Sequence, residues 1–293
     1  MNLAALKDRL PWWTRIVAKI VLSRLPARYA VWQRLGLFRH GKMDEAGYAS
    51  DVFDRHVAFA GMQGALRGKT ILELGPGDSV ATAIIAAAHG ARAALVDAGR
   101  FASQDLRVYE GLVRRLKARQ LNPPEIGGCR DLDEMLAAAD ARYLTQGLTS
   151  LAGIDAESVD FIYSQAVLEH VRRDEFLATQ RECARILRPD GVCSHRIDLQ
   201  DHLGGGLNNL RFPASVWESQ LFARSGFYTN RIQFDAMIGL FEQAGFSVEI
   251  GEVSRWEEMP IARWQLAREF RGLPDRALDV RGFDVLLRRA PGA

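Results

Sequence analysis

The sequence contains, at residues 70–79, the run Thr70-Ile71-Leu72-Glu73-Leu74-Gly75-Pro76-Gly77-Asp78-Ser79. Its first five residues predict a short buried strand that stops at Gly75. The alanine-rich residues 81–89 then predict a helix that ends at Gly90. A strand, a glycine loop and a helix in this order indicate a nucleoside site, because glycine lets a ligand approach the backbone and a helix N-terminus can receive a carboxylate.

The next predicted strand ends at an acidic residue. It spans residues 92–96, and Asp97 follows it about 20 residues after the glycines, where a carboxylate can bind both ribose hydroxyls. A plain tight turn followed by a solvated aspartate is the alternative interpretation. The complete order of strand, loop, helix, strand and acid favours the nucleoside site.

Two residues of the loop bear on which nucleoside binds. A dinucleotide site needs a third small residue at position 80, and this chain has Val80. Asp78 also places negative charge where the phosphates of a dinucleotide would lie. Both features disfavour NAD and favour a ligand with a cationic centre, such as the sulfonium of S-adenosylmethionine.

The rest of the chain alternates strands and helices, which predicts a doubly wound α/β fold. Further strands are expected at residues 141–144, 159–163, 192–197, 246–253 and 282–287, and further helices at 101–119, 174–187, 234–244 and near 261–270. We divide the chain into an N-terminal helical extension (1–66), with helices near 11–25, 29–37 and 44–59, and a main domain (67–293). An acceptor-covering insertion at 200–232, after the fifth strand, contains a triple-glycine hinge at 204–206.

Several motifs together resemble the class I S-adenosylmethionine-dependent methyltransferases, in the branch that includes ubiquinone-biosynthesis and small-molecule or glycan-tailoring enzymes. They are residues 72–78, Asp97, residues 158–164, the run Ala166-Val167-Leu168-Glu169-His170-Val171, and residues 185–191. The resemblance covers about residues 67–199. It implies a Rossmann-like, mostly parallel seven-stranded sheet with helices on both faces, and methyl transfer from S-adenosylmethionine to leave S-adenosylhomocysteine.

The cofactor residues follow from the loop and from the resemblance. Many relatives hold the adenine with an acid after the third strand, but here that region reads Gly147-Leu148-Thr149-Ser150, so we expect Leu148 to contact the adenine through apolar surface. Ser164 and Gln165, after the fourth strand, are expected to face the methyl group. The predicted set is Glu73, Gly75, Pro76, Gly77, Asp78, Ser79, Asp97, Ala98, Leu148, Ser164 and Gln165.

A hydroxyl acceptor would need a base at the carboxyl edge of the sheet. Glu169, His170 and His195 fall there by topology, as do Asp198, Asp201 and His202, and a histidine suits proton transfer at neutral pH. His170 could instead only brace the following helix. Some relatives bind a divalent ion through Glu-x-x-Glu-His, but Ala166 replaces the first glutamate. We therefore expect no metal.

The acceptor is expected to lie under residues 200–232. Trp217 would form part of an apolar wall, and the polar residues Tyr228, Asn230 and Arg231 would bind polar or acidic groups. The aromatic residues could equally be the core of a small cap. The acceptor itself is predicted to be a small molecule, a glycan or a lipid-linked group, methylated at oxygen by analogy with relatives.

Composition limits the partners. The chain of 293 residues has 38 basic and 36 acidic residues, so its bulk charge does not predict nucleic-acid binding. Sparse cysteine and the absence of a signal-peptide pattern predict a cytoplasmic protein. Two tryptophans and interspersed basic residues in the first helix would also suit a peripheral site at the inner membrane face, although packing on the parent domain is the favoured interpretation. The sequence does not indicate an oligomeric state.

Two other functions remain open at this stage. One is a methyltransferase-like domain that has lost catalysis and serves as a binding protein. The other is a nicotinamide-dependent oxidoreductase or epimerase, which Val80 and Asp78 disfavour. A nucleic-acid methyltransferase is set aside, because residues 164–167 lack the motif that grips an exocyclic amine.

Overall fold

The computed structural model describes residues 13, 14, 16 and 43–291, and its strands form one sheet in the order β3-β2-β1-β4-β5-β7-β6. Strand β7 runs antiparallel to both neighbours, and the others run parallel to one another. The predicted fold class is confirmed. The strands are β1 Thr70–Leu74, β2 Arg92–Val96, β3 Ala141–Leu144, β4 Val159–Gln165, β5 Leu187–Asp198, β6 Phe246–Arg255 and β7 Val280–Arg289.

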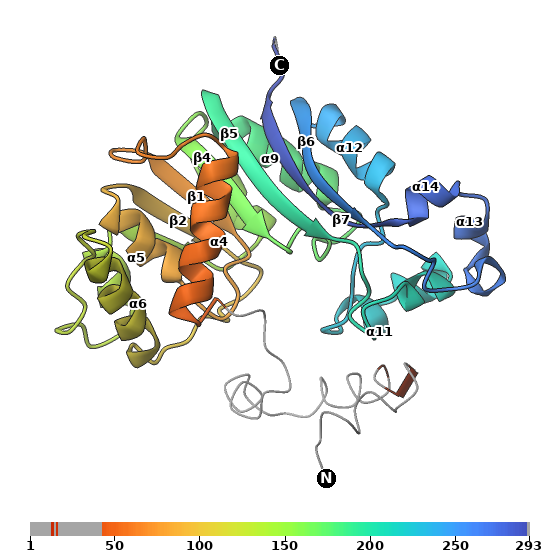
Figure 1. Cartoon of the computed structure of the whole chain (residues 1–293), viewed down its shortest axis with the longest axis horizontal. Coiled ribbons are helices and arrows are strands. Elements are labelled where there is room, and N and C mark those ends of the chain that lie inside the picture. The colour runs from red at the N-terminus through yellow and green to blue at the C-terminus, as the bar shows by residue number, and fades with distance from the viewer. Residues whose placement is uncertain (1–12, 15, 17–42, 292–293) are drawn as a thin grey trace.

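Helices cover both faces of this sheet (Figure 1). Alternate strand residues point to opposite faces, so Ile71 belongs to one apolar core and Leu72 to the other. The first core holds α4 Ala46–Phe59, α5 Ala81–Ala88, α6 Arg107–Ala118 and α7 Leu132–Ala138. The second holds α8 Leu148–Ala152, α9 Phe176–Ile186 and α12 Phe234–Gln243.

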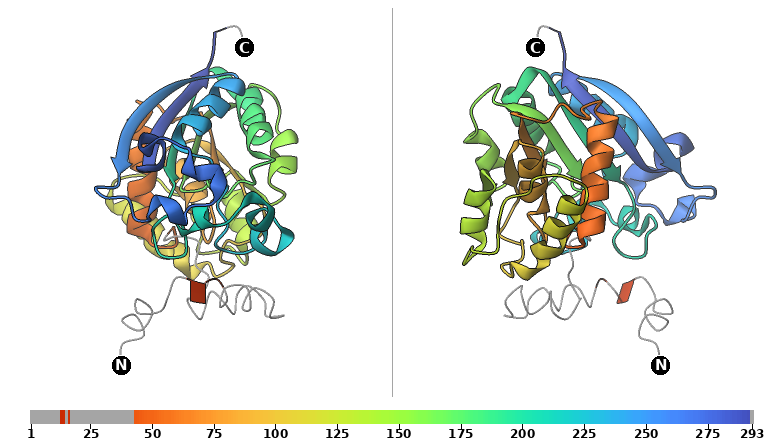
Figure 2. Two further views of the ribbon diagram at one scale, coloured as in Figure 1. Left: turned by 90° about the vertical axis from the view of Figure 1, so that its right-hand side faces the viewer. Right: turned by 60° about the vertical axis from the view of Figure 1, so that its left-hand side comes forward.

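Two insertions lie at the carboxyl edge of the sheet, and we call them together the cap (residues 200–232 and 256–279). The first holds η1 Asn208–Arg211, α10 Ala214–Trp217 and α11 Gln220–Ala223. The second, which the sequence did not mark as part of a cap, holds η2 Arg263–Gln265, α13 Arg268–Arg271 and α14 Asp275–Leu278. Figures 1 and 2 show both beyond the same end of β5, β6 and β7.

An apolar cluster joins the two insertions. Leu207 and Leu210 from the first pack with Leu266 and Phe270 from the second. The N–H of Ala267 also donates to the carbonyl of Leu210, with an N–O distance of 2.8 Å. The cap is therefore one packed unit, although its parts are distant in sequence.

Three predicted elements differ most from the structure. Helix α6 begins at Arg107 and not at residue 101, because the N–H groups of Phe101 and Ala102 donate to the Tyr143 hydroxyl. The helix expected near 261–270 is broken into η2 and α13, since the chain turns there to meet Leu210. Strand β5 begins at Leu187, which pairs with Val159 before a register shift.

The predicted triple-glycine hinge is a turn built around Asp201. The buried carboxylate of Asp201 accepts hydrogen bonds from the N–H groups of Leu203, Gly204, Gly205 and Asn208. The helices predicted near 11–25 and 29–37 lie outside the described residues except at positions 13, 14 and 16. No helix in the described part of the chain has the length and apolar character to cross a membrane.

Candidate active site

The glycine loop after β1 adopts a conformation that favours glycine. Gly75 has a φ of +66° and Gly77 a φ of +63°. The N–H of Gly75 donates to the carbonyl of Val96 at 2.8 Å, which joins the loop to the end of β2. A Cβ atom at Gly75 would lie 2.5 Å from Cγ1 of Val167, so the turn after β4 packs directly on the loop.

Asp97 lies against this loop. Its Oδ2 accepts a hydrogen bond from the N–H of Gly77 at 3.0 Å, and its Oδ1 accepts one from the N–H of Ala98 at 2.7 Å. The carbonyl of Asp97 accepts the N–H of Gly147, which brings Leu148 to the same edge. The structure thus gathers the glycines, Asp97, Ala98 and the start of α8, as a nucleoside site requires.

Glu73 is a buried acid at the end of β1. The hydroxyls of Thr82 and Tyr163, which are hydrogen-bonded to each other, lie near its carboxyl, and its Oε2 has no hydrogen-bond partner among the described residues. Burial raises the pKa of Glu73 to about 8, against a weaker opposing effect of those two hydroxyls. The end of β1 therefore carries, beside the loop, a carboxyl group that is mostly protonated at neutral pH and has one oxygen that could accept a hydrogen bond from a nearby donor.

The two residues expected to face the methyl group differ in their surroundings. Ser164 is fully buried, and its hydroxyl lies 2.8 Å from Nδ1 of His195. Gln165 is half-buried, and its Oε1 accepts a hydrogen bond from Nε2 of His56 at 3.2 Å. Because that amide oxygen is engaged, the amide NH₂ of Gln165 is the group best able to meet a ligand. Their contact with the methyl group stays a prediction.

His170 is exposed in the turn after β4. Its Nδ1 lies 2.8 Å from the carbonyl oxygen of Tyr228 in the cap, and its ring stacks on His202 with centroids 4.7 Å apart. A carbonyl oxygen can only accept, so Nδ1 carries the hydrogen. In the neutral ring, Nε2 then holds the lone pair that a base needs.

The other two predicted catalytic residues are buried. Burial raises the pKa of Glu169 well above its ordinary value, and neither carboxyl oxygen has a hydrogen-bond partner among the described residues. Burial lowers the pKa of His195 to about 3, so this ring is neutral, and it stacks on Phe241. Their catalytic roles stay predictions.

The four residues predicted to bind the acceptor all lie in the first insertion and are all buried. Nε1 of Trp217 donates to the carbonyl of Thr229 at 2.7 Å. The hydroxyl of Tyr228 donates to Glu218 at 2.8 Å, and the amide of Asn230 donates to backbone carbonyls of the turn after β4. These polar groups are bonded within the protein, and acceptor contact stays a prediction.

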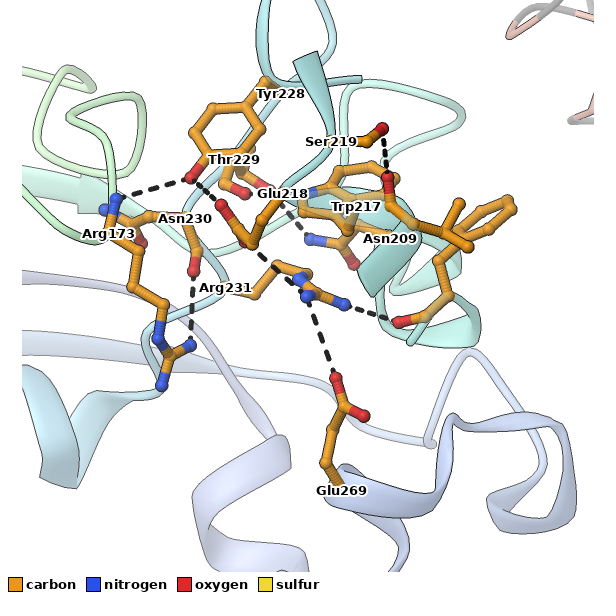
Figure 3. Close-up of polar contacts among 12 residues, drawn as sticks. Arg173, Asn209, Trp217, Glu218, Ser219, Tyr228, Thr229, Asn230, Arg231 and Glu269 are labelled. Carbon is orange, nitrogen blue, oxygen red and sulfur yellow. Dashed lines mark hydrogen bonds and ion pairs between the residues drawn. The ribbon is translucent and has the colours of Figure 1, made fainter. Parts of the chain in front are cut away.

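Arg231 is the central cation of the cap (Figure 3). Its Nη1 donates to the carbonyl of Phe212 at 2.6 Å, and its Nη2 lies 3.6 Å from Glu218 and 3.8 Å from Glu269. The guanidinium also lies 5.4 Å from the ring centre of Trp217 and 5.1 Å from that of Phe270. One buried side chain therefore bonds to both insertions, although burial lowers its pKa.

Two residues that support the site were not predicted from the sequence. His56 on α4 bonds to both Ser194 and Gln165, and the hydroxyl of Tyr109 on α6 accepts the N–H of Val80 in the glycine loop. His56 lies on the buried face of α4 with Val52, Phe53 and Val57, and a histidine on such a mostly apolar face was the available signal. No pattern in the neighbouring sequence marked Tyr109 as a residue that supports the site.

The chain matches the family described as "Methyltransferase domain" over residues 72–194, which span β1 to the middle of β5 and include the glycine loop, Asp97 and the turn after β4. The chain carries a class I S-adenosylmethionine-dependent methyltransferase domain. The cofactor of this domain is S-adenosylmethionine, which becomes S-adenosylhomocysteine. No curated protein matches the sequence.

Solved structures similar to the methyltransferase chain have low identities. A protein from Pyrococcus horikoshii is 11% identical with a TM-score of 0.46, and the match covers 90% of this chain and 100% of that one. A putative sarcosine dimethylglycine methyltransferase from Galdieria sulphuraria is 15% identical with a TM-score of 0.44, covering 81% and 84%. A Haemonchus contortus phosphoethanolamine N-methyltransferase 2 is 13% identical with a TM-score of 0.41, covering 76% and 49%.

The residues of the methyltransferase domain fit its cofactor. The left-handed glycines shape the loop at the end of β1, Asp97 is held against the loop by the N–H of Gly77, and Glu73 has a buried oxygen that could accept a hydrogen bond from a donor. Among the residues described, no three His, Cys, Asp or Glu side chains are grouped so that they could hold a metal ion.

Proposed function

We propose that the protein transfers a methyl group from S-adenosylmethionine to an oxygen of a small-molecule, glycan or lipid-linked acceptor, with His170 as the general base. The observation that carries the base assignment is the hydrogen bond from His170 Nδ1 to the carbonyl of Tyr228 at 2.8 Å. It fixes the tautomer whose Nε2 can take a proton. The ring is exposed at the carboxyl edge, where ligands of open α/β sheets bind.

The cofactor is held, in this proposal, by two groups of residues. Gly75, Pro76, Gly77, Asp78 and Ser79 form the loop that would border its amino-acid part. Asp97 binds the ribose hydroxyls, and Ala98 and Leu148 contact the adenine. Bound S-adenosylmethionine supplies an electrophilic methyl group and a neutral thioether leaving group.

The protein's own part is alignment and proton removal. As the acceptor oxygen takes the methyl group that S-adenosylmethionine would supply, leaving the thioether, the hydroxyl proton would pass to Nε2 of His170. The cap would cover the acceptor and exclude water, which strengthens electrostatic interactions at the reacting atoms. An oxygen acceptor is favoured over nitrogen because a hydroxyl gains more from a positioned base.

The first experiment screens hydroxyl acceptors, including phenols, sugars, hydroxy acids and lipid-linked glycans, with methyl-labelled S-adenosylmethionine, and identifies products by mass spectrometry. The base is then tested with His170→Gln, and with His89→Gln as a matched control at the end of α5, far from the edge in the fold. We expect His170→Gln to lower kcat about 100-fold or more, within the range for general bases, with unchanged affinity for S-adenosylhomocysteine.

Three results would count against parts of this proposal. Turnover of His170→Gln within severalfold of the parent would overturn the base assignment. A product methylated only at nitrogen or carbon would overturn the oxygen acceptor. Tight binding of S-adenosylhomocysteine with no transfer to any acceptor class would favour the catalytically silent binding protein.

A further inference from the structure

The side chain of Asn230 lies between the cap and the turn after β4, and it is fully buried. Its Nδ2 donates to the carbonyl of Leu168 at 2.8 Å and to the carbonyl of Val171 at 3.0 Å. Its Oδ1 accepts the N–H of Ile232 at 3.0 Å. Its own backbone N–H donates to the carbonyl of Glu169 at 2.7 Å.

Three of these four hydrogen bonds reach the backbone beside His170, and the bond to Ile232 stays within the cap. Those three engage carbonyls at positions 168, 169 and 171, so the backbone on both sides of His170 is bonded to one residue of the cap. Such a set needs two donors and one acceptor on a short side chain, which asparagine has and aspartate lacks. An aspartate there would place oxygen against two carbonyl oxygens.

The same cap segment also holds the imidazole of His170. Tyr228 lies two residues before Asn230, and its carbonyl accepts the hydrogen bond from His170 Nδ1. Residues 228 and 230 thus bind the ring and the backbone of the same turn. Figure 3 shows this segment crossing from the aromatic part of the cap to Arg173 in the turn region.

Arg231 fixes this segment on its other side. Its φ is +57°, so the chain turns sharply there, and its side chain bonds Phe212, Glu218 and Glu269 from both insertions. Any movement of the cap against the sheet would act on Asn230 and Tyr228 together.

We propose that Asn230 is a positioning residue that holds the turn after β4 so that Tyr228 fixes the tautomer of His170. This role rests on the proposed function, in which His170 is the general base. The segment predicted to bind the acceptor thereby acts on the reaction through His170. Residues 228–231 thus couple the position of the cap to the tautomer of His170.

The test measures the state of the ring without any acceptor. Two-dimensional ¹⁵N–¹H spectra of histidine side chains in the full chain report tautomer and pKa, and the His170 signals are those lost in His170→Gln. We expect the parent protein to show the Nδ1–H tautomer once the ring is neutral. Asn230→Asp should give a mixture of tautomers and a shifted pKa, and Asn230→Ser, which carries no charge, should do the same.

Asn209→Asp is the matched control. Asn209 is also a buried asparagine of the cap, but its amide donates to Thr229 and not to the turn. It should destabilise the cap and leave the His170 tautomer as in the parent. Once an acceptor is known, Asn230→Asp should lower kcat by at least tenfold and leave the affinity for S-adenosylhomocysteine within about twofold.

An unchanged His170 tautomer and pKa in folded Asn230→Asp or Asn230→Ser would overturn the positioning role. The same change of tautomer in Asn209→Asp would also overturn it, because any damage to the cap would then suffice. The spectra decide the positioning, and turnover of His170→Gln decides the base, so the failure of one is distinguishable from the failure of the other.

Discussion

The side chain of Val167, in the turn after β4, lies over Gly75, in the loop after β1. A Cβ atom built on Gly75 would come within 2.5 Å of one methyl carbon of Val167 and 2.6 Å of the other. Val167 follows Ala166, whose φ of +53° turns the chain towards the loop. The two loops expected to border the cofactor are thus packed against each other, and a side chain at Gly75 would separate them.

Gly75→Ala is therefore expected to abolish measurable binding of S-adenosylhomocysteine in calorimetry. The substitution strains a left-handed backbone by roughly 1–3 kcal/mol and also forces Val167 away from the loop. The matched control is Gly64→Ala, because Gly64 has a φ of +74° but nothing within 4 Å of its Cβ position. It should lose a similar amount of stability and bind normally. Equal loss of affinity in both variants would contradict this account.

Local patterns predicted the part of the fold that forms the cofactor edge. Strands β1 and β2 have the predicted bounds, because each is a run of consecutive, mainly apolar residues that ends just before Gly75 or Asp97. The second insertion was not predicted as cap. Its path depends on the hydrogen bond from Ala267 to Leu210, residues 57 positions apart, and no local pattern encodes such a contact.

The residues of the candidate site also divide into those that the sequence predicted and those that it did not. The glycines and Asp97 could be found from the sequence because a fixed spacing along the chain places them together. The environment of Asn230 could not, since its partners at 168–171 lie about 60 residues away and only the folded chain brings them near. The burial of Glu169 and His195 could not be predicted either, because both are polar residues in segments that the sequence places at the carboxyl edge of the sheet.

Glu73 should make the protein less stable as pH rises from 6.5 to 8. Its pKa is raised by burial from 4.5 to about 8, so the folded state keeps a proton that the unfolded state has lost. Stability is then lost as pH rises through the folded pKa, by at most about 1.4 kcal/mol per pH unit for one group. Glu169, whose pKa is also raised, acts in the same direction.

Between pH 6.5 and 8 the protonation of the buried histidines does not affect the stability of the protein. Burial lowers the pKa of His56 to about 4 and that of His195 to about 3, so both affect stability only below 6.5, where stability falls as pH falls. Urea unfolding at several pH values should show a flatter slope for Glu73→Gln than for the parent. The exposed control Glu249→Gln should keep the parent's slope. Identical slopes in all three proteins would refute the role of Glu73.

Arg231→Lys should lower the free energy of unfolding by about 2–3 kcal/mol. Lysine keeps the charge but loses the flat guanidinium that faces Trp217 and Phe270, and it loses the charged hydrogen bond to the Phe212 carbonyl. The ion pairs add little, because Glu218 and Glu269 are partly exposed. Thermal and urea unfolding measure the change, with Arg268→Lys, at an exposed position of α13, as control. A loss no greater than that of the control would show that the planar contacts do not matter.

Ile16 packs against the cap. It is 6% exposed and packs in a cluster with Leu203, Trp217 and Phe227, whereas Trp13 is 54% exposed. Ile16→Ala should lower the free energy of unfolding by about 2 kcal/mol, the low end of the range for a buried isoleucine, because it leaves a gap beside Trp217. Trp13→Ala should change it by less than about 0.5 kcal/mol.

The same pair of variants separates packing on the cap from binding to a membrane. If Ile16 serves to pack on the cap, the full chain should not sediment with vesicles of anionic lipid at low salt, a condition that favours electrostatic binding. Binding to such vesicles that Trp13→Ala abolishes, with no change in stability for Ile16→Ala, would show instead that Trp13 meets a membrane surface. A lipid-linked acceptor would then be the first to test.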